Sequence, residues 1–345
     1  GVNLSPLRSS GETLSAGGRS SGPVAFMRGA DSVAGMIASG GSTRRAAKMV
    51  VMNIDHPDIV QFIRCKAEEE KKVRALMEAG YQMYDLNNPA WNSIQYQNAN
   101  NSVRVTDEFM AAVESDEQWT TRYVTTGEPA QEYRARDLMA EIAKAAWESG
   151  DPGMQYDTTI NRWHTNPHTG RITTSNPCSE YLSIDNSACN LSSINLLQYL
   201  NTDGSFDVRR FIHTVDVMIL AQEILVDGSS YPTEKIGKNA HDFRQLGLGY
   251  ANLGALLMAW GMPYDSDAAR HTAGAITALM TGEAYRYSAE MARRMGPYAG
   301  YAVNREPQLA VIGMHRDAVA RVRTSLVRDR AIYDAAAMAW DDAVS

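Results

Sequence analysis

The sequence predicts a single α/β domain built around a mainly parallel sheet or barrel. Short apolar runs of strand length alternate with longer segments of helical spacing. The hydrophobic fraction of 44% and the charged fraction of 21% are typical of a folded globular protein. The 345 residues contain no linker-like stretch and no internal repeat, so residues 1–345 are treated as one domain.

The first predicted elements are a loop, a helix and a strand. Residues 9–22 are rich in glycine and serine and predict a loop. A short helix is expected over residues 31–39, stopped by Gly40 and Gly41. Residues 48–54 form an apolar run of strand length, which predicts a buried parallel strand.

A long helix is expected after this strand. Residues 55–58, Asp-His-Pro-Asp, supply a capping residue and a proline near the first helical position. The helix then runs through the charged residues 66–72 and ends at Gly80. The Asp-His-Pro-Asp run also has the side chains of a metal site, but helix capping is the simpler interpretation.

A second strand and a second long helix continue the alternation. Residues 102–105 predict the strand, and Thr106 or Asp107 caps the helix behind it. Residues 134–149 have apolar side chains at helical spacing, and Gly150 ends that helix.

Two more long helices are expected in the second half of the chain, over residues 207–226 and 266–295. Gly247, Gly249 and Gly254 lie between them. Their spacing is not that of the dinucleotide-binding fingerprint, so they are interpreted as sites of close helix packing.

Composition and charge limit the class of protein. The formal net charge of −7 argues against a general nucleic-acid surface. No apolar run reaches the roughly 18 residues of a membrane span. Three cysteines are too few for a secreted disulfide scaffold, which favours a reducing cytoplasm. Because the chain begins without an initiator Met or a signal pattern, we expect a fragment, truncated at both ends.

Residues 175–182, Ser-Asn-Pro-Cys-Ser-Glu-Tyr-Leu, are the most informative segment. Pro177 pushes the residue before it toward extended backbone. In an extended run, Asn176, Cys178 and Glu180 project from one face, over about 13 Å at roughly 3.3 Å per residue. An amide can orient a hydroxyl, a carboxylate can take its proton, and a thiol can perform the harder step. These three residues are therefore the candidate active site.

Cys189 is a second candidate thiol, eleven residues after Cys178. An odd separation puts two side chains on opposite faces of one straight strand, but the polar residues 185–187 supply a bend that brings both toward one pocket. Cys189 itself precedes a segment that alternates like a strand. The alternative that the two cysteines bind a metal lacks the close Cys/His spacing of zinc sites.

These segments resemble the active-site region of ribonucleotide reductase large subunits. The resemblance rests on Asn-Pro-Cys-x-Glu at residues 176–180 and on Ala-Cys-Asn-Leu-Ser-Ser-Ile-Asn-Leu at residues 188–196. Further similar stretches lie at residues 1–8, 55–59, 97–103 and 246–253, so the resemblance covers nearly the whole chain. Residues 70–105 are most similar to the adenosylcobalamin-dependent class II enzymes.

The resemblance implies part of a ten-stranded α/β barrel, as in glycyl radical enzymes, with Cys178 at the tip of a central finger loop. Cys178 would carry a thiyl radical that abstracts the 3′ hydrogen of a ribonucleotide. Glu180 would act as general base on the 3′ hydroxyl, and Asn176 would hydrogen-bond the sugar hydroxyls. Cys189 would be one of two reducing thiols that end as a disulfide, its partner being expected upstream of Gly1.

A cofactor and partners are implied as well. Adenosylcobalamin would generate the radical, without a histidine ligand, because no Asp-x-His-x-x-Gly pattern occurs, and no metal site is expected. A thioredoxin- or glutaredoxin-type protein would reduce the thiol pair, and a homodimer is expected. The substrate is a ribonucleoside diphosphate or triphosphate. A loop that grips its phosphates is expected beyond Ser345, so the chain alone is expected to be inactive.

The resemblance also implies an effector site for a deoxynucleoside triphosphate or ATP. Its candidate residues are Arg8, Gly17, Gly18 and Arg19 in a first loop, and Asn88 and Gln97 in a relay loop of residues 87–97. An arginine beside exposed backbone amides suits phosphate. A flexible loop that binds no ligand is the alternative for residues 9–22.

Two rival functions follow from the same segments. A class I large subunit would take its radical from a separate small subunit, which activity with adenosylcobalamin and a dithiol alone would exclude. A non-catalytic nucleotide-binding relative would have the barrel without the chemistry. The joint presence of the amide, the two thiols and the carboxylate argues against that second rival.

Overall fold

The computed structural model describes residues 1–37, 47–85 and 88–345. The chain divides into two compact units. The first comprises Gly1–Trp163 and Ile172–Ser183, and the second comprises His164–Arg171 and Ile184–Ser345. Parallel strands connected through helices occur in both units, which confirms the predicted α/β class. The assignment of residues 1–345 to one domain stays a prediction.

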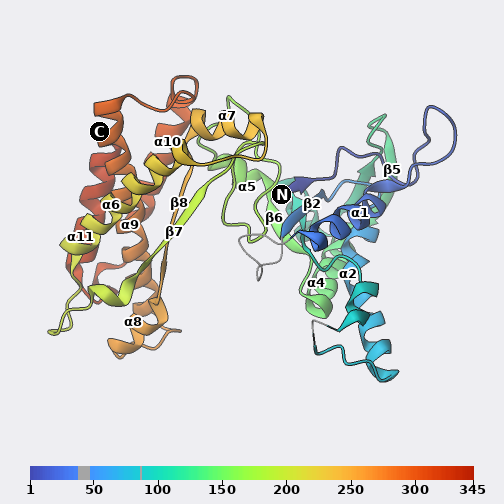
Figure 1. The fold of residues 1–345 in the computed structure, drawn as a ribbon, viewed down its shortest axis with the longest axis horizontal. Coiled ribbons are helices and arrows are strands. Elements are labelled where there is room, and N and C mark those ends of the chain that lie inside the picture. Colours follow the sequence, from blue (N-terminus) through green and yellow to red (C-terminus); the bar gives the residue numbers. More distant parts are fainter. Residues whose placement is uncertain (38–46, 86–87) are drawn as a thin grey trace. The chain divides into compact units, whose positions relative to one another are not determined.

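The first unit is built on a four-stranded parallel sheet in the order β1-β2-β3-β6 (Figure 1). Its strands are β1 (Val2–Asn3), β2 (Lys48–Asn53), β3 (Ala99–Val105) and β6 (Gly153–Tyr156). A separate antiparallel hairpin, which the sequence did not predict, consists of β4 (Gln118–Arg122) and β5 (Pro129–Arg134). The helices are α1 (Gly22–Met36), α2 (Ile59–Glu78), α3 (Asp107–Ser115), α4 (Ala135–Ser149), α5 (Asp157–Arg162) and the 3₁₀ helix η1 (Pro89–Ser93).

One face of this sheet is apolar. Val50 and Met52 of β2 and Val103 of β3 belong to a buried cluster that includes Phe62 of α2 and Leu138 of α4. All five are at most 1% exposed, so this face and its two helices form the core of the unit.

The opposite face of the sheet is polar along β3 and β6, beside the apolar Met49 and Val51 of β2. Side chains alternate along a strand, so Asn100, Ser102 and Arg104 of β3 share this second face, and the strand register places Gln155 of β6 beside Arg104. Ser102, Arg104 and Gln155 are each only 3% exposed. Parallel strands in α/β domains are ordinarily apolar on both faces. A buried polar face is therefore a candidate functional surface.

Several predicted boundaries are confirmed. The strand at residues 48–54 is β2, and α2 runs to the turn at Gly80. Thr106, not Asp107, caps α3, because its Oγ1 accepts the Phe109 N–H at 3.4 Å. Gly150, with a φ of +83°, ends α4 as predicted.

The first helix differs from its prediction. It begins at Gly22 rather than at residue 31, because Pro23 occupies the first turn, where its fixed φ suits a helix start. The predicted end at residue 39 and the stop at Gly40 and Gly41 lie outside the described residues.

The predicted capping role of residues 55–58 is wrong. Asp58 precedes α2 but makes no capping bond. Its carboxylate instead accepts hydrogen bonds from Ser10 N at 2.8 Å and Ser10 Oγ at 2.9 Å. The His56 ring lies between the Leu7 carbonyl, at 2.9 Å, and the Asp58 N–H, at 3.0 Å. The segment therefore fastens residues 7–10 to the start of α2.

The second unit consists of a parallel strand pair and a set of helices (Figure 1). The strands are β7 (Asn190–Asn195) and β8 (Leu246–Ala251). The helices are α6 (Val208–Gly228), α7 (Glu234–Phe243), α8 (Leu253–Ala259), α9 (Asp267–Met295), α10 (Tyr301–Val319) and α11 (Arg330–Val344), with 3₁₀ helices η2 (Leu196–Tyr199) and η3 (Thr324–Leu326). The helices expected over residues 207–226 and 266–295 are α6 and α9.

The interpretation of Gly247 and Gly249 as helix-packing sites is wrong, because both lie in β8. A Cβ atom at Gly247 would lie 2.3 Å from Leu191 Cδ2 and 3.2 Å from Cys189 Sγ. At Gly249 the nearest atom would be 3.8 Å away. A side chain at Gly247 would therefore force the exposed Leu191 side chain to move, whereas a side chain at Gly249 would make only ordinary contacts.

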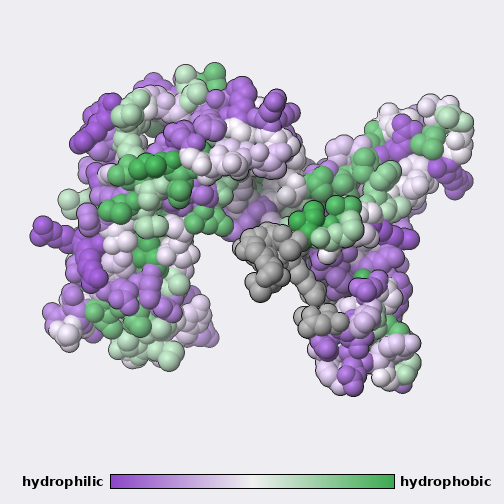
Figure 2. Space-filling model, in the orientation of Figure 1, coloured by the Kyte–Doolittle hydropathy of each residue, from purple (hydrophilic) through white to green (hydrophobic). Residues whose placement is uncertain are grey.

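The outer face of α6 is unusually apolar. Val217, Leu220, Ile224 and Leu225 are each more than 40% exposed, and a green patch lies over part of α6 in Figure 2. Within the described part of the chain, no helix is both long and apolar enough to cross a membrane.

Candidate active site

Residues 176–179 form a β-turn, where extended backbone was predicted. The Ser179 N–H donates to the Asn176 carbonyl at 3.1 Å. Pro177 occupies the second position, which its ring favours, and Cys178 the third. Ser179 has a φ of +64°, in the left-handed region. The expected extended run is therefore wrong, because proline suits a turn start as well as a strand.

The amide of Asn176 closes this turn into a small loop. Its Oδ1 accepts the Tyr181 N–H at 3.0 Å, and its own backbone N–H donates to the Tyr181 carbonyl at 3.3 Å. Within the described residues, the side-chain Nδ2 donates no hydrogen bond, so it is the group of Asn176 that can donate to a ligand hydroxyl.

Cys178 and Glu180 are both exposed on this loop. Cys65, in contrast, is buried in α2, and its Sγ accepts a hydrogen bond from Asn101 Nδ2 at 3.4 Å. Burial raises the pKa of the Cys65 thiol to about 12, so this thiol stays protonated. Of the two cysteines in the first unit, Cys178 is therefore the accessible one.

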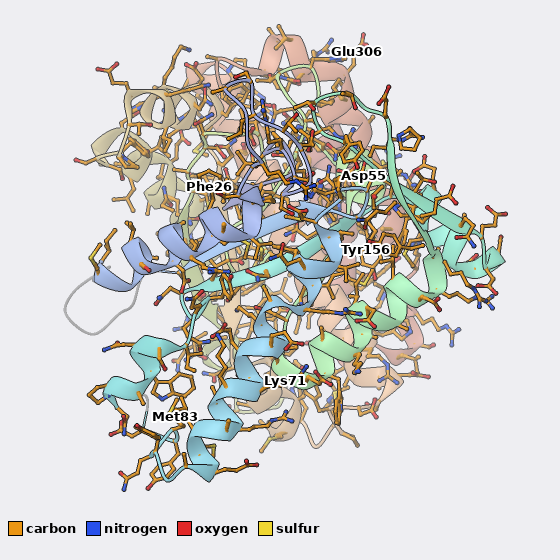
Figure 3. All side chains as sticks on the ribbon, turned by 90° about the vertical axis from the view of Figure 1, so that its right-hand side faces the viewer. Phe26, Asp55, Lys71, Met83, Tyr156 and Glu306 are labelled. Atoms are coloured by element: carbon orange, nitrogen blue, oxygen red, sulfur yellow. The ribbon has the colours of Figure 1, made fainter. Side chains whose placement is uncertain are left out.

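The segment before the turn crosses the polar face of the sheet. Asn3 Nδ2 holds the Thr173 carbonyl at 2.9 Å, Gln155 Nε2 donates to Ser175 Oγ at 2.7 Å, and Asn100 Nδ2 holds the Pro177 carbonyl at 2.7 Å. Gln155 directly precedes Tyr156, which is labelled on the ribbon in Figure 3. The sequence did not single out Gln155 or Asn100. Only the strand alternation of β3 and β6 could have pointed to them.

Cys189 belongs to the second unit and is half-buried directly before β7. Gln222 of α6 fixes the backbone around it. The Gln222 Nε2 donates to the Asn190 carbonyl at 3.2 Å and to the Gly247 carbonyl at 2.7 Å. The predicted strand after Cys189 is confirmed as β7.

The predicted phosphate-binding loop is a small folded hairpin. Thr13 pairs with Arg19 in an antiparallel bridge, and Arg8 Nη1 donates to the Thr13 carbonyl at 2.8 Å. Gly17 and Gly18 have φ values of +87° and +88° and make the tight turn at its exposed tip. Arg19 thus lies on this hairpin, and Arg8 contacts it from the preceding segment.

Glu12 fixes this hairpin to the rest of the unit. Its carboxylate accepts hydrogen bonds from the Ser9 N–H at 2.6 Å, from Thr125 N at 2.8 Å and from Thr125 Oγ1 at 2.7 Å. Burial alone raises the pKa of Glu12, but the hydrogen bonds from Thr125 and Ser9 outweigh it and lower that pKa to about 2.

Replacement of Glu12 by Gln is expected to destabilise the protein by about 1–3 kcal/mol near neutral pH. Because the folded-state pKa lies below the ordinary value of 4.5, the native state binds fewer protons. The stabilisation is thus complete above that value and is lost as pH falls toward 2. Urea unfolding of both proteins from pH 6 down to pH 2 tests this. A stability difference that does not shrink with acid contradicts it.

The predicted relay loop, whose first residue Asn87 lies outside the described residues, contacts α1 at its far end. Asp31 of α1 accepts hydrogen bonds from the backbone N–H groups of Gln97 and Asn98, both at 3.0 Å. Asn88 uses its Oδ1 to cap the 3₁₀ helix η1. The Gln97 side chain is exposed.

Three comparisons bear on this arrangement. Residues 1–344 match the family model described as the barrel domain of ribonucleotide reductase. A "Vitamin B12-dependent ribonucleotide reductase" from Streptomyces clavuligerus is 55% identical over 346 residues, or 99% of this chain and 36% of that relative. The relative of the same name from Rhodopirellula baltica is 52% identical over 344 residues, or 99% of this chain and 33% of its own.

A more distant relative carries a more specific name. The "Vitamin B12-dependent ribonucleoside-diphosphate reductase" of Mycobacterium tuberculosis is 35% identical over 306 residues, covering 88% of this chain and 41% of its own length. This chain spans 36% of the Streptomyces relatives, so it aligns with about a third of a longer protein.

Proposed function

Because this chain belongs to the ribonucleotide reductase family through its barrel domain, we propose that it is part of an adenosylcobalamin-dependent enzyme that reduces ribonucleotides to deoxyribonucleotides. The observation that carries the proposal is the exposed Cys178, held on a tight turn above a buried polar sheet face. The names and identity of the relatives support the same chemistry.

The residues of the turn divide the work of the reaction. A thiyl radical on Cys178 takes the hydrogen atom from C3′ of the ribose and returns one at the end of the cycle. Glu180 takes the proton of the 3′ hydroxyl while water leaves from C2′. Asn176 offers its Nδ2 hydrogens to the sugar hydroxyls, since its Oδ1 already accepts the Tyr181 N–H. Cys189 and a second thiol together supply two electrons and two protons and end as a disulfide.

The position of Cys178 fits the proposed cofactor. Adenosylcobalamin, when bound, supplies the organic radical that oxidises the Cys178 thiol. Hydrogen-atom transfer needs close approach to the sulfur, and Cys178 is exposed on a turn rather than packed in the core. Among the described residues no three His, Cys, Asp or Glu side chains gather as a metal-binding group.

Regulation and partners belong to the same proposal. Arg8 and Arg19, with the backbone of Gly17 and Gly18, bind the phosphates of a nucleoside triphosphate effector. The relay loop that contains Asn88 and Gln97 then transmits the binding of the effector to the site that holds the substrate base. A thioredoxin- or glutaredoxin-type reductant restores the thiols. The enzyme acts as a homodimer in a reducing cytoplasm.

The direct test assays the full-length protein that contains this chain. With adenosylcobalamin, a dithiol and each ribonucleoside diphosphate or triphosphate, deoxyribonucleotide should form without any metal-radical partner subunit. Product formed only after addition of such a subunit would identify the class I type. Nucleotide binding without product under both conditions would identify a non-catalytic relative.

Replacement of Glu180 by Gln in the full-length enzyme is expected to lower kcat by about 10²- to 10⁴-fold, because the amide cannot take the proton of the 3′ hydroxyl. The Km for the ribonucleotide should change little. Steady-state assays measure both, with Glu306→Gln, a change of an exposed carboxylate on α10, as the matched control. Equal activity of the two variants would remove Glu180 from the mechanism.

A further inference from the structure

Four buried polar side chains lie in a chain of hydrogen bonds beneath the Cys178 turn. They are Asp157, Arg104, Gln155 and Ser175, and none is more than 8% exposed. Burial of so many polar groups is costly unless each is hydrogen-bonded. The chain lies on the polar face of the sheet, behind the segment that leads into the turn.

This series of hydrogen bonds begins at Arg104. Its Nε donates to Asp157 Oδ1 at 2.6 Å, its Nη2 to the Ile172 carbonyl at 2.6 Å, and its Nη1 to Gln155 Oε1 at 2.9 Å. A guanidinium only donates hydrogen bonds, so the Gln155 carbonyl oxygen must face it. The amide orientation of Gln155 therefore follows from the charge of Arg104 and is not a free choice.

The direction of the next bonds follows from that orientation. The Gln155 Nε2 group faces the serines and donates to Ser175 Oγ at 2.7 Å. The Ser175 hydroxyl then directs its own hydrogen to its nearest acceptor, the Asn176 carbonyl at 2.8 Å, rather than to Ser179 Oγ at 3.2 Å. The same carbonyl accepts the Ser179 N–H that closes the turn. The chain thus ends on the atom that fixes the turn of Cys178.

We propose that Gln155 and Ser175 are positioning residues, which use the polarity imposed by the Arg104–Asp157 pair to fix the turn that presents the Cys178 sulfur. The inference rests on the proposed function, since it assumes that Cys178 reacts with substrate. Hydrogen-atom transfer depends steeply on geometry, and a misplacement of about 1 Å costs up to roughly 10²-fold in rate.

Gln155→Glu is the sharpest variant, because it keeps the size of the side chain and an acceptor for Arg104. A carboxylate cannot donate, so the Ser175 hydroxyl turns its hydrogen toward residue 155 and away from the Asn176 carbonyl. In the full-length enzyme with adenosylcobalamin, kcat should fall about 10- to 100-fold. The Km for the ribonucleotide should stay within about two-fold, since no substrate contact is removed.

Ser175→Ala is the second variant and adds no charge. It removes the bond to the Asn176 carbonyl and should lower kcat by a similar factor. Hydrogen–deuterium exchange supplies a measurement that does not depend on activity. In both variants the amides of Asn176 and of residues 178–181 should exchange at least about ten-fold faster, while those of α4 stay unchanged. Ser149→Ala is the matched control, because Ser149 Oγ donates to the Ala145 carbonyl at 3.0 Å within α4.

Parental kcat and parental exchange in both variants would overturn the inference. So would losses accompanied by a raised Km and by faster exchange throughout the unit, which would show a merely structural role. The proposed function fails separately, if Cys178→Ser remains active. An inactive Cys178→Ser together with a fully active Ser175→Ala rejects the positioning role alone.

Discussion

Replacement of Cys178 by Ser in the full-length enzyme is expected to lower deoxyribonucleotide formation by at least about 10³-fold, the scale of loss when a catalytic nucleophile is removed. A serine hydroxyl holds its hydrogen too strongly to form the oxygen radical under conditions that oxidise a thiol. Nucleotide binding should persist, because the turn is held by backbone and by Asn176 rather than by the sulfur. Product assays and equilibrium nucleotide binding measure the two effects.

Cys65→Ser is the matched control for this experiment. Cys65 is buried in α2, and its raised pKa of about 12 keeps the thiol protonated. The control should retain its activity and lose stability only modestly. Comparable activity in the two variants would mean that the sulfur at 178 has no part in the reaction.

Replacement of Arg104 by Leu is expected to lower the free energy of unfolding of the first unit by about 3–5 kcal/mol, the usual loss when one partner of a buried ion pair is removed. Arg104 is 3% exposed and donates hydrogen bonds to Asp157, to Gln155 and to the Ile172 carbonyl. The variant leaves all three acceptors without this donor, although their residues are at most 8% exposed. Urea unfolding measures the loss.

Arg64→Leu is the control for that comparison. Arg64 also forms an ion pair, with Glu141 at 2.7 Å, but its side chain is 50% exposed. An exposed pair contributes at most about 1 kcal/mol. Equal losses at positions 104 and 64 would contradict the claim that the polar sheet face is buried and interdependent.

Elements with a strong local signal could be predicted from the sequence. The apolar run of β2, the helical spacing of α4 and the stop at Gly150 each depend on a few neighbouring residues. The start of α1 was missed because the glycine- and serine-rich run before it outweighed the signal of Pro23. In β8, the low strand preference of two glycines hid a strand whose formation depends on its partner β7.

The candidate site was found only in part. Asn176, Cys178 and Glu180 are recognisable because they lie within five residues of one another. The residues that support the turn are not recognisable from the sequence. Gln155 and Arg104 lie on strands 20 and 71 residues before Ser175. Periodicity cannot show which face of a strand a later segment will cover. Pro177 likewise suits either an extended run or a turn, and only the long-range bonds from Asn100 and Gln155 decide between them.

The close approach at Gly247 has a consequence for how this sequence can diverge. Even a methyl group there would meet Leu191 and the sulfur of Cys189, whereas the same change at Gly249 meets nothing closer than 3.8 Å. Two glycines that look equivalent in the sequence are thus constrained unequally: a side chain at position 247 forces the exposed Leu191 side chain to move aside, whereas a side chain at position 249 meets no close neighbour.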